Sequence, residues 1–382
     1  MAFVHCGSEE CTKSELDLFQ IAPTQTSIEK SIYIEVPPLS AITESAPIDF
    51  FIAGNGIDYM DLNNTLLYLC CKIVKGDGAE LAADAEVGLV NYPVASIFSQ
   101  LDVTLGDRLI SQSNNCYPYR AFIESVLNYS DDTLATQFSA GLFYKDTAGQ
   151  HEETELDGGN LGFVRRAKLT ARSRTVELLG HLHSDLFFQE KLLLNGVDVK
   201  IKLTRSKDAF CLMGSAAEGF KLRIVSASLF VKKVRVAPGV RLGHAEALLT
   251  ANAKYPVDRV GMKVFSIPAG SRIPTKPLQP DFEAGRCVRE YMNLVQTAGK
   301  HMKDRSLLID REEFAQGYTL FAFDLSPDQE CADHYSLIKT GNLRAEIRFG
   351  RALTVTVNMI VYGVFDNVIE INQRRNVLFD YM

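Results

Sequence analysis

Short stretches in which apolar and polar residues alternate recur along this chain of 382 residues. In residues 353–361 the odd positions are apolar, and the even positions include Thr354, Thr356 and Asn358. Alternation of period two with β-branched residues predicts a strand that buries one face. Comparable patterns predict strands at residues 31–36, 48–53, 66–74, 99–110, 175–182, 186–191, 197–203, 220–236, 263–267, 286–293, 318–324 and 344–349.

Two of these stretches carry finer signals. Residues 99–110 contain Gly106 and Asp107, which predict a turn between two strands. Within residues 220–236 the apolar positions change parity between Ile224 and Val225, which predicts a β-bulge.

Helical spacing of apolar residues occurs once in each half, at residues 118–129 and 241–251. Many short strands with few helices and long loops favour antiparallel sandwiches. The predicted fold class is therefore all-β, with two tandem antiparallel sandwiches and one short helix inserted in each. We divide the chain into an N-terminal arm (residues 1–27), a first sandwich (28–208) and a second sandwich (209–382).

Composition supports this division and excludes some partners. The length suits two domains, because domains commonly have ~100–200 residues. The net charge is −7 and no Lys/Arg block interrupts the chain, so we expect no direct sequence-specific binding of nucleic acid. The first ten residues lack the features of a signal peptide, and no run of 18 apolar residues predicts a membrane span. The eight cysteines have no CxxC spacing, so we expect reduced thiols, several of them buried.

The sequence contains few signals of chemistry. GxxxxGK[ST], GxGxxG and GxSxG motifs are absent. His181 and His183 share one face of a predicted strand, as zinc ligands can, but no third ligand is identifiable, so an interface or surface position is favoured. The acidic stretch at residues 152–157 lacks EF-hand spacing and predicts a solvated loop. We therefore predict no catalytic residue, no cofactor-binding residue and no metal site, and expect the chain not to be an enzyme.

Several segments, in this order along the chain, resemble the double jelly-roll major capsid proteins of Polinton/Maverick elements and the related adintoviruses. They are residues 16–19 (LDLF) with 23–27 (PTQTS), 59–62 (YMDL), 98–103 (FSQLDV), 119–129 (YRAFIESVLNY), 314–318 (FAQGY), 323–326 (FDLS) and 363–377. Together these segments span nearly the whole chain.

The resemblance implies that the two sandwiches are jelly rolls standing side by side. Three chains would then form a pseudo-hexameric capsomer, and such homotrimers would tile an icosahedral virus-like shell. The partners implied are other copies of the chain and a penton or minor capsid protein. The localisation implied is the virion, with assembly in the host cell nucleus. Two physical considerations agree with a trimer. Neighbouring chains would cover the edge strands of the sandwiches, and closed symmetry would limit the number of chains in each capsomer.

Two other classes of function remain open. A non-viral β-sandwich could bind carbohydrate or protein, although the chain has no Trp with which to stack a sugar. An enzyme of the cupin type would need a cluster of His with a carboxylate, and the chain has seven His in all.

Five residues are predicted to make assembly contacts. Leu16, Leu18 and Phe19 form an apolar patch in the arm, and we expect this patch to tuck beneath the trimer. Arg374 and Arg375 follow the last long strand, and we expect them to pair with acidic residues of a neighbouring sandwich. The alternatives are a frayed arm and a solvated tail.

Overall fold

The structure is a computed structural model, and it consists mainly of antiparallel strands. It describes residues 7–379 except for 12, 20, 215–217, 268–277, 302–305, 328–333, 338–340, 342, 344, 346 and 348. Within this part of the chain every pairing between named strands is antiparallel. The predicted all-β, antiparallel fold class is therefore confirmed.

One four-stranded sheet contains three strands of the predicted first sandwich and one strand from beyond residue 208. Its order is β1 (Ile28–Val36), β10 (Lys221–Val236), β3 (Asp58–Val74) and β7 (Val176–His181). The register of β10 on β3 shifts between Ile224 and Ser226, which confirms the predicted bulge. β1 is an edge strand of this sheet, and the N-terminal arm leads directly into β1.

A second four-stranded sheet faces the first. Its order is β2 (Ile48–Ile52), β8 (Val199–Arg205), β5 (Phe98–Leu105) and β6 (Arg108–Gln112). Gly106, at φ +55, opens the β5–β6 hairpin, as the turn signal predicts. Leu67 and Leu69 of β3 and Ile201 of β8 are buried in one core cluster, because alternate side chains of both sheets point inward. A small pair, β4 (Val87–Leu89) with β9 (Leu212–Gly214), completes this region.

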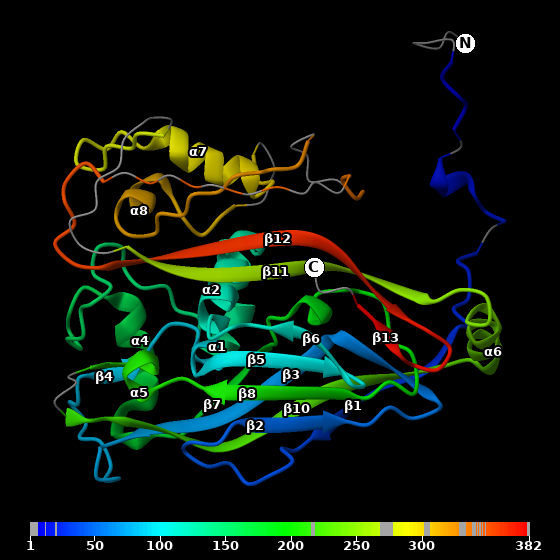
Figure 1. The fold of residues 1–382 in the computed structure, drawn as a ribbon, viewed down its shortest axis with the longest axis horizontal. Coiled ribbons are helices and arrows are strands. Elements are labelled where there is room, and N and C mark those ends of the chain that lie inside the picture. Colours follow the sequence, from blue (N-terminus) through cyan, green and yellow to red (C-terminus); the bar gives the residue numbers. More distant parts are fainter. Residues whose placement is uncertain are drawn as a thin grey trace.

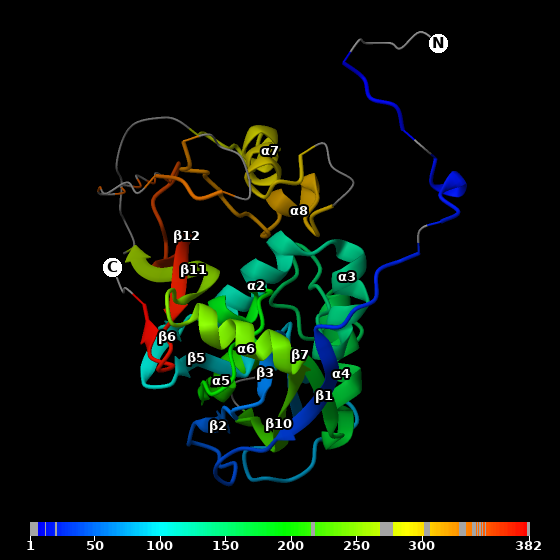
Figure 2. The same cartoon turned by 90° about the vertical axis from the view of Figure 1, so that its right-hand side faces the viewer.

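A long β-ribbon lies across the first sandwich, as Figure 1 shows. It pairs β11 (Ala253–Ile267) with β12 (Val357–Ile371) over fifteen residues of each strand, and β13 (Val377–Leu378) adds to the end of β12. In the view of Figure 1, α7 and α8 lie on the far side of this ribbon from the first sandwich, and Figure 2 shows them above α2 and α3.

Helices flank the sheets. They are α1 (Pro93–Ser96), α2 (Tyr117–Asn128), α3 (Asp131–Ala135), α4 (Leu161–Thr170), α5 (Asp208–Cys211), α6 (Pro238–Ala247), α7 (Val288–Thr297) and α8 (Arg311–Ala315). Short 3-10 turns occur at Ser14–Leu16, Gln137–Gly141, Ala171–Ser173 and Asp185–Phe187. The two helices predicted from spacing are α2 and α6, and the structure adds two further helices of ten residues, α4 and α7, and four of four or five residues, α1, α3, α5 and α8. No helix in the described residues is long and apolar enough to cross a membrane.

Some predicted strands are wrong. Residues 286–293 fall largely in helix α7, where Leu294 and Glu290 are buried one turn apart. Residues 186–191 begin with a 3-10 turn, and residues 318–324 belong to no strand. Short apolar runs do not distinguish helix from strand, which is the reason for these errors. The strand predicted at residues 344–349 lies partly outside the described residues.

The strand pairing bears on where the chain divides. β10 lies beyond residue 208 in the sequence, yet it pairs with β1 and β3 in one sheet. A division at residue 208 would separate β10 from its sheet. The two-unit organisation stays a prediction, and the pairing favours a boundary after Val236.

Candidate functional site

The apolar patch of the arm is exposed. Leu16, Leu18 and Phe19 have 67%, 76% and 97% of their surfaces accessible, and Ile21, which the sequence analysis did not single out, is equally open. Figures 1 and 2 both show the arm running clear of the sheets before it enters β1. Four large apolar side chains in water are available for contact with another surface. Docking beneath a trimer stays a prediction.

The two arginines after β12 have different surroundings. Arg375 is held within the chain, because its Nε donates to the backbone oxygen of Asn195 (2.6 Å) and its Nη2 donates to the side-chain oxygen of the same residue (2.9 Å). Its partner is thus an asparagine rather than an acid. Arg374 is exposed, so pairing with an acid of a neighbouring sandwich stays a prediction for Arg374.

A group of buried charged side chains lies where α2 meets the β11–β12 ribbon. Arg120 donates from Nε to Glu124 Oε1 (2.8 Å) and pairs through Nη2 with Asp185 Oδ1 (2.7 Å). His183 Nδ1 lies 2.9 Å from Glu124 Oε2, and its Nε2 lies 3.0 Å from the Tyr92 hydroxyl. All five side chains are buried, so removing one partner would leave another charge or polar group without compensation.

This buried cluster also holds the ribbon. The backbone N–H of Val260 in β11 donates to Asp185 Oδ1 (3.2 Å), and the Tyr362 hydroxyl in β12 donates to Glu124 Oε1 (3.4 Å). Each strand of the ribbon therefore has a polar contact with the body of the first sandwich. We call Arg120, Glu124, His183, Asp185 and Tyr362 the junction cluster.

The pKa values of the two carboxyl groups of the junction cluster shift in opposite directions. Burial raises the pKa of Glu124, but the charge of Arg120 and the hydrogen bond from His183 outweigh it, so its pKa lies below the usual range. Burial also raises the pKa of Asp185, and Arg120 offsets this only in part, so the pKa of Asp185 lies above the usual range. Asp185 is consequently the first of the two to take up a proton as the pH falls.

Of the two histidines considered as zinc ligands, His183 belongs to the junction cluster. His183 is engaged by Glu124 and Tyr92, and burial lowers the pKa of the half-buried His181. In the described ranges, no group of three or more His, Cys, Asp or Glu could hold a metal ion. The described cysteines are free thiols, and Cys71 and Cys211 are fully buried.

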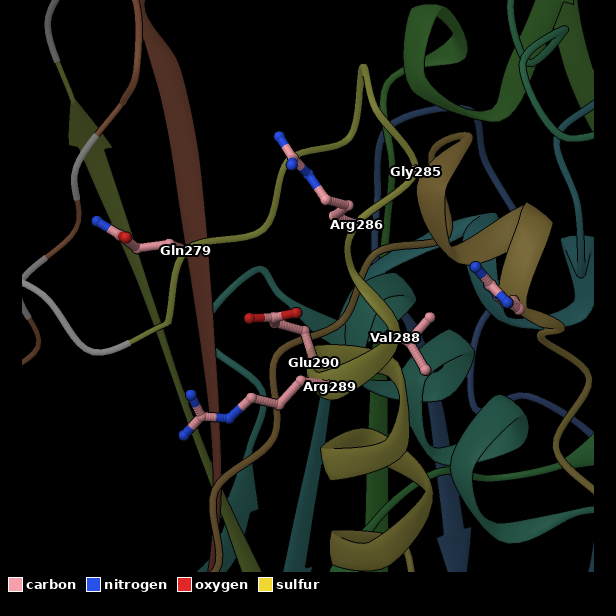
Figure 3. Close-up of a pocket in the computed structure, with 7 residues that line it drawn as sticks. Gln279, Gly285, Arg286, Val288, Arg289 and Glu290 are labelled. Atoms are coloured by element: carbon pink, nitrogen blue, oxygen red, sulfur yellow. The ribbon is translucent and has the colours of Figure 1, made fainter.

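An open pocket of about 480 Å³ lies at the N-terminal end of α7 (Figure 3). Three of its lining residues are the arginines Arg286, Arg289 and Arg311. Arg286 pairs with Asp281 at 2.6 Å, and Figure 3 shows the side chains of Arg286 and Arg289 pointing in different directions. These charged groups thus do not converge on one point. A catalytic or ligand-binding centre requires groups that do converge.

Sequence reasoning did not identify the junction cluster. Arg120 and Glu124 are spaced i, i+4 in a segment predicted to be helical, which was the available signal. Their contacts with Asp185, Val260 and Tyr362 depend on long-range packing, and no local pattern encodes them.

Comparison with known proteins gives distant similarities. No family model matches the chain. The Caenorhabditis elegans protein described as uncharacterized protein F54H12.2 is 22% identical over 424 residues, which cover 94% of this chain and 99% of that protein.

Among solved structures, three similar chains come from viruses. A chain in the cryo-EM structure of the Sputnik virophage has a TM-score of 0.46 and 12% identity, covering 70% of this chain and 58% of its own. A chain of the PBCV-1 virus capsid has a TM-score of 0.41 and 11% identity, covering 66% and 53%. The mavirus major capsid protein has a TM-score of 0.38 and 11% identity, covering 71% and 60%. This chain therefore spans less than two thirds of each of these three.

Proposed function

We propose that this chain is a structural capsid protein of the double jelly-roll type, related to those of the Polinton/Maverick and adintovirus group. In this proposal three copies form a pseudo-hexameric capsomer, and capsomers tile an icosahedral shell. Other copies and a penton protein are the partners, and the chain resides in the virion after assembly in the nucleus. It binds no specific nucleic-acid sequence and catalyses no reaction.

The observation that carries the proposal is the position of the resembling segments in the structure. Residues 119–129 lie almost entirely within α2 and contain Arg120 and Glu124, and residues 363–377 contain the second half of β12, directly after Tyr362. Residues 119–129 therefore supply two members of the junction cluster, and residues 363–377 begin next to a third, Tyr362. The resemblance thus includes the part of α2 that holds the ribbon to the sandwich.

The exposed surfaces agree with assembly. The arm carries four open apolar side chains, and β1 and β2 are edge strands of their sheets. Exposed strand edges and apolar patches are often covered by a partner chain. A shell built from copies of the chain would supply that cover.

The proposal is tested by the mass of the purified protein. Light scattering at micromolar concentration should give three times the chain mass of 42.4 kDa, and electron images should show compact particles of pseudo-hexagonal outline. A monodisperse monomer would overturn the proposal. A trimer is expected to have large buried contacts, so its mass should persist on dilution to the nanomolar range.

A further inference from the structure

Helix α4 presents an outward face that mixes apolar and cationic side chains. Leu161, Arg165 and Leu169 are spaced four residues apart and are exposed, so they form one row along the helix. Lys168 and Arg172 extend the positive charge toward the C-terminal end. These three cations lie within eight residues of the chain, two on α4 and Arg172 in the 3-10 turn that directly follows it. We call these five residues the α4 face.

The buried side of α4 is fixed to the rest of the chain by hydrogen bonds and close packing. The fully buried Arg166 donates from Nε to the backbone oxygen of Leu89 (2.7 Å) and from Nη2 to Asp146 Oδ1 (2.7 Å). The Asn160 side chain caps the helix by accepting from the N–H of Phe163. A Cβ at Gly162 would lie 2.2 Å from the Lys145 oxygen, so the helix approaches its support as closely as glycine permits.

The last cation of the α4 face is also fixed. Arg172 has φ +55 and Ser173 has φ +52, a left-handed backbone that costs non-glycine residues energy. The N–H of Leu81 donates to Ser173 Oγ at 2.8 Å and supports this turn. The position of Arg172 is thus set by the fold and does not depend on a flexible loop.

An acidic loop directly precedes the helix. Glu152, Glu155 and Asp157 are exposed and Glu153 is half-buried. In the described part of the chain, neither these acids nor the cations of the α4 face make an ion pair. Among the described residues, the four acids before the helix and the three cations of the α4 face therefore have no ion-pair partner in a single copy, although Arg165 lies over the ring of Tyr144, 6.0 Å from its centroid.

We propose that the α4 face and the acidic loop form a self-complementary contact between two copies related by a twofold axis. The acidic loop of each copy lies against the cationic end of the other copy's α4. An isologous contact requires both halves of the complementarity on one patch, which is the arrangement here. The inference rests on the proposed function, in which this contact joins neighbouring trimers.

The charge arrangement favours a second copy over a nucleic acid. Two α4 helices running antiparallel would place acids beside cations at both ends, and would oppose the helix dipoles favourably. The same contact would bury Leu161 and Leu169 away from water. A phosphate backbone tracking the cations would meet the carboxylates one helix length away, about 15 Å, and be repelled.

Charge reversal tests the contact. The first variant is Arg165→Glu with Lys168→Glu, the second is Glu152→Lys with Glu155→Lys, and the third combines all four. Sedimentation velocity would measure the association of purified trimers at low and high salt. Either double variant should weaken trimer–trimer association at least tenfold, and the combined variant should recover most of it.

A matched control reverses two exposed cations elsewhere. Lys221→Glu with Arg223→Glu alters the same charge on β10 and should leave association unchanged. Thermal unfolding of every variant reports whether the fold is retained. Binding of double-stranded DNA would be measured in parallel by gel shift.

The outcomes separate this inference from the proposed function. Absence of the trimer itself contradicts the proposed function. Trimers whose association is insensitive to salt, to the reversals or to their combination overturn only the twofold contact. DNA binding that is lost in the first variant, with unchanged trimer association, would assign the α4 face to a polyanion and also overturn it.

Discussion

The Tyr362 hydroxyl of β12 donates to Glu124 Oε1 of α2 at 3.4 Å, across 238 positions of the chain. This contact joins the ribbon to the sandwich through a carboxylate that Arg120 and His183 already hold in place. The ribbon is thus attached to a preformed group of charges, and its attachment can be tested separately from the folding of the sandwich.

Replacing Tyr362 by Phe removes the hydroxyl and keeps the ring. We expect the free energy of unfolding to fall by about 1 kcal/mol, since Glu124 retains its other partners. Amide exchange in residues 357–371 should quicken more than exchange in β3. The exposed Tyr33→Phe is the control and should change neither. Equal exchange rates in β12 of the wild type and the variant would show that the hydroxyl contributes nothing.

Replacing Arg120 by Met should have a larger effect. The substitution leaves Glu124 and Asp185 buried beside each other without their shared cation, and removing one member of a buried ion pair costs roughly 3–5 kcal/mol. Urea unfolding followed by circular dichroism measures the loss. Arg374→Met, at an exposed position, should cost almost nothing. Similar losses for the two variants would contradict the structural role of Arg120.

The raised pKa of Asp258 predicts that the free energy of unfolding depends on pH. Burial, followed by the charges of Asp366 and Asp185, raises the pKa of Asp258, and the register places Asp258 opposite Asp366. A carboxyl group whose pKa is raised by folding favours the folded state when protonated. Its contribution is therefore present below the unfolded pKa and is lost as the pH rises through the folded pKa.

The substitution Asp258→Asn should remove this loss. Between about pH 4, near the unfolded pKa of an aspartate, and pH 7, the wild type should lose more stability than the variant, as measured by urea unfolding at several pH values. Asp84→Asn changes an exposed carboxyl group and should follow the wild type. Parallel pH profiles of the wild type and Asp258→Asn would contradict the prediction.

The arm is expected to act in assembly rather than in folding. Deleting residues 1–27, or replacing Leu16, Leu18 and Phe19 by Ser, should leave the protein trimeric and abolish shell formation, because the exposed side chains contribute nothing to the core. Electron imaging counts the shells. Leu39→Ser removes an equally exposed leucine outside the arm and serves as the control. Normal shells from the truncated chain would refute this role.

The sequence by itself determined the features that depend on neighbouring residues. The hairpin at Gly106, the bulge beside Ile224 and the helices α2 and α6 follow from local alternation, turn residues and helical spacing. The sequence also singled out the apolar patch of the arm, whose role in assembly stays a prediction.

Tertiary structure alone decided what depends on distant partners. Residues 288–293 belong to helix α7, in which Glu290 and Leu294 are buried one turn apart, and the local apolar pattern does not reveal this. The pairing of β10 with β1 and β3 placed it in the first sandwich, and packing brought Asp185 and Tyr362 to α2. Long-range contacts depend on the summed burial of many side chains. Local sequence patterns therefore do not specify these contacts, and the packing of the folded core determines which of them form.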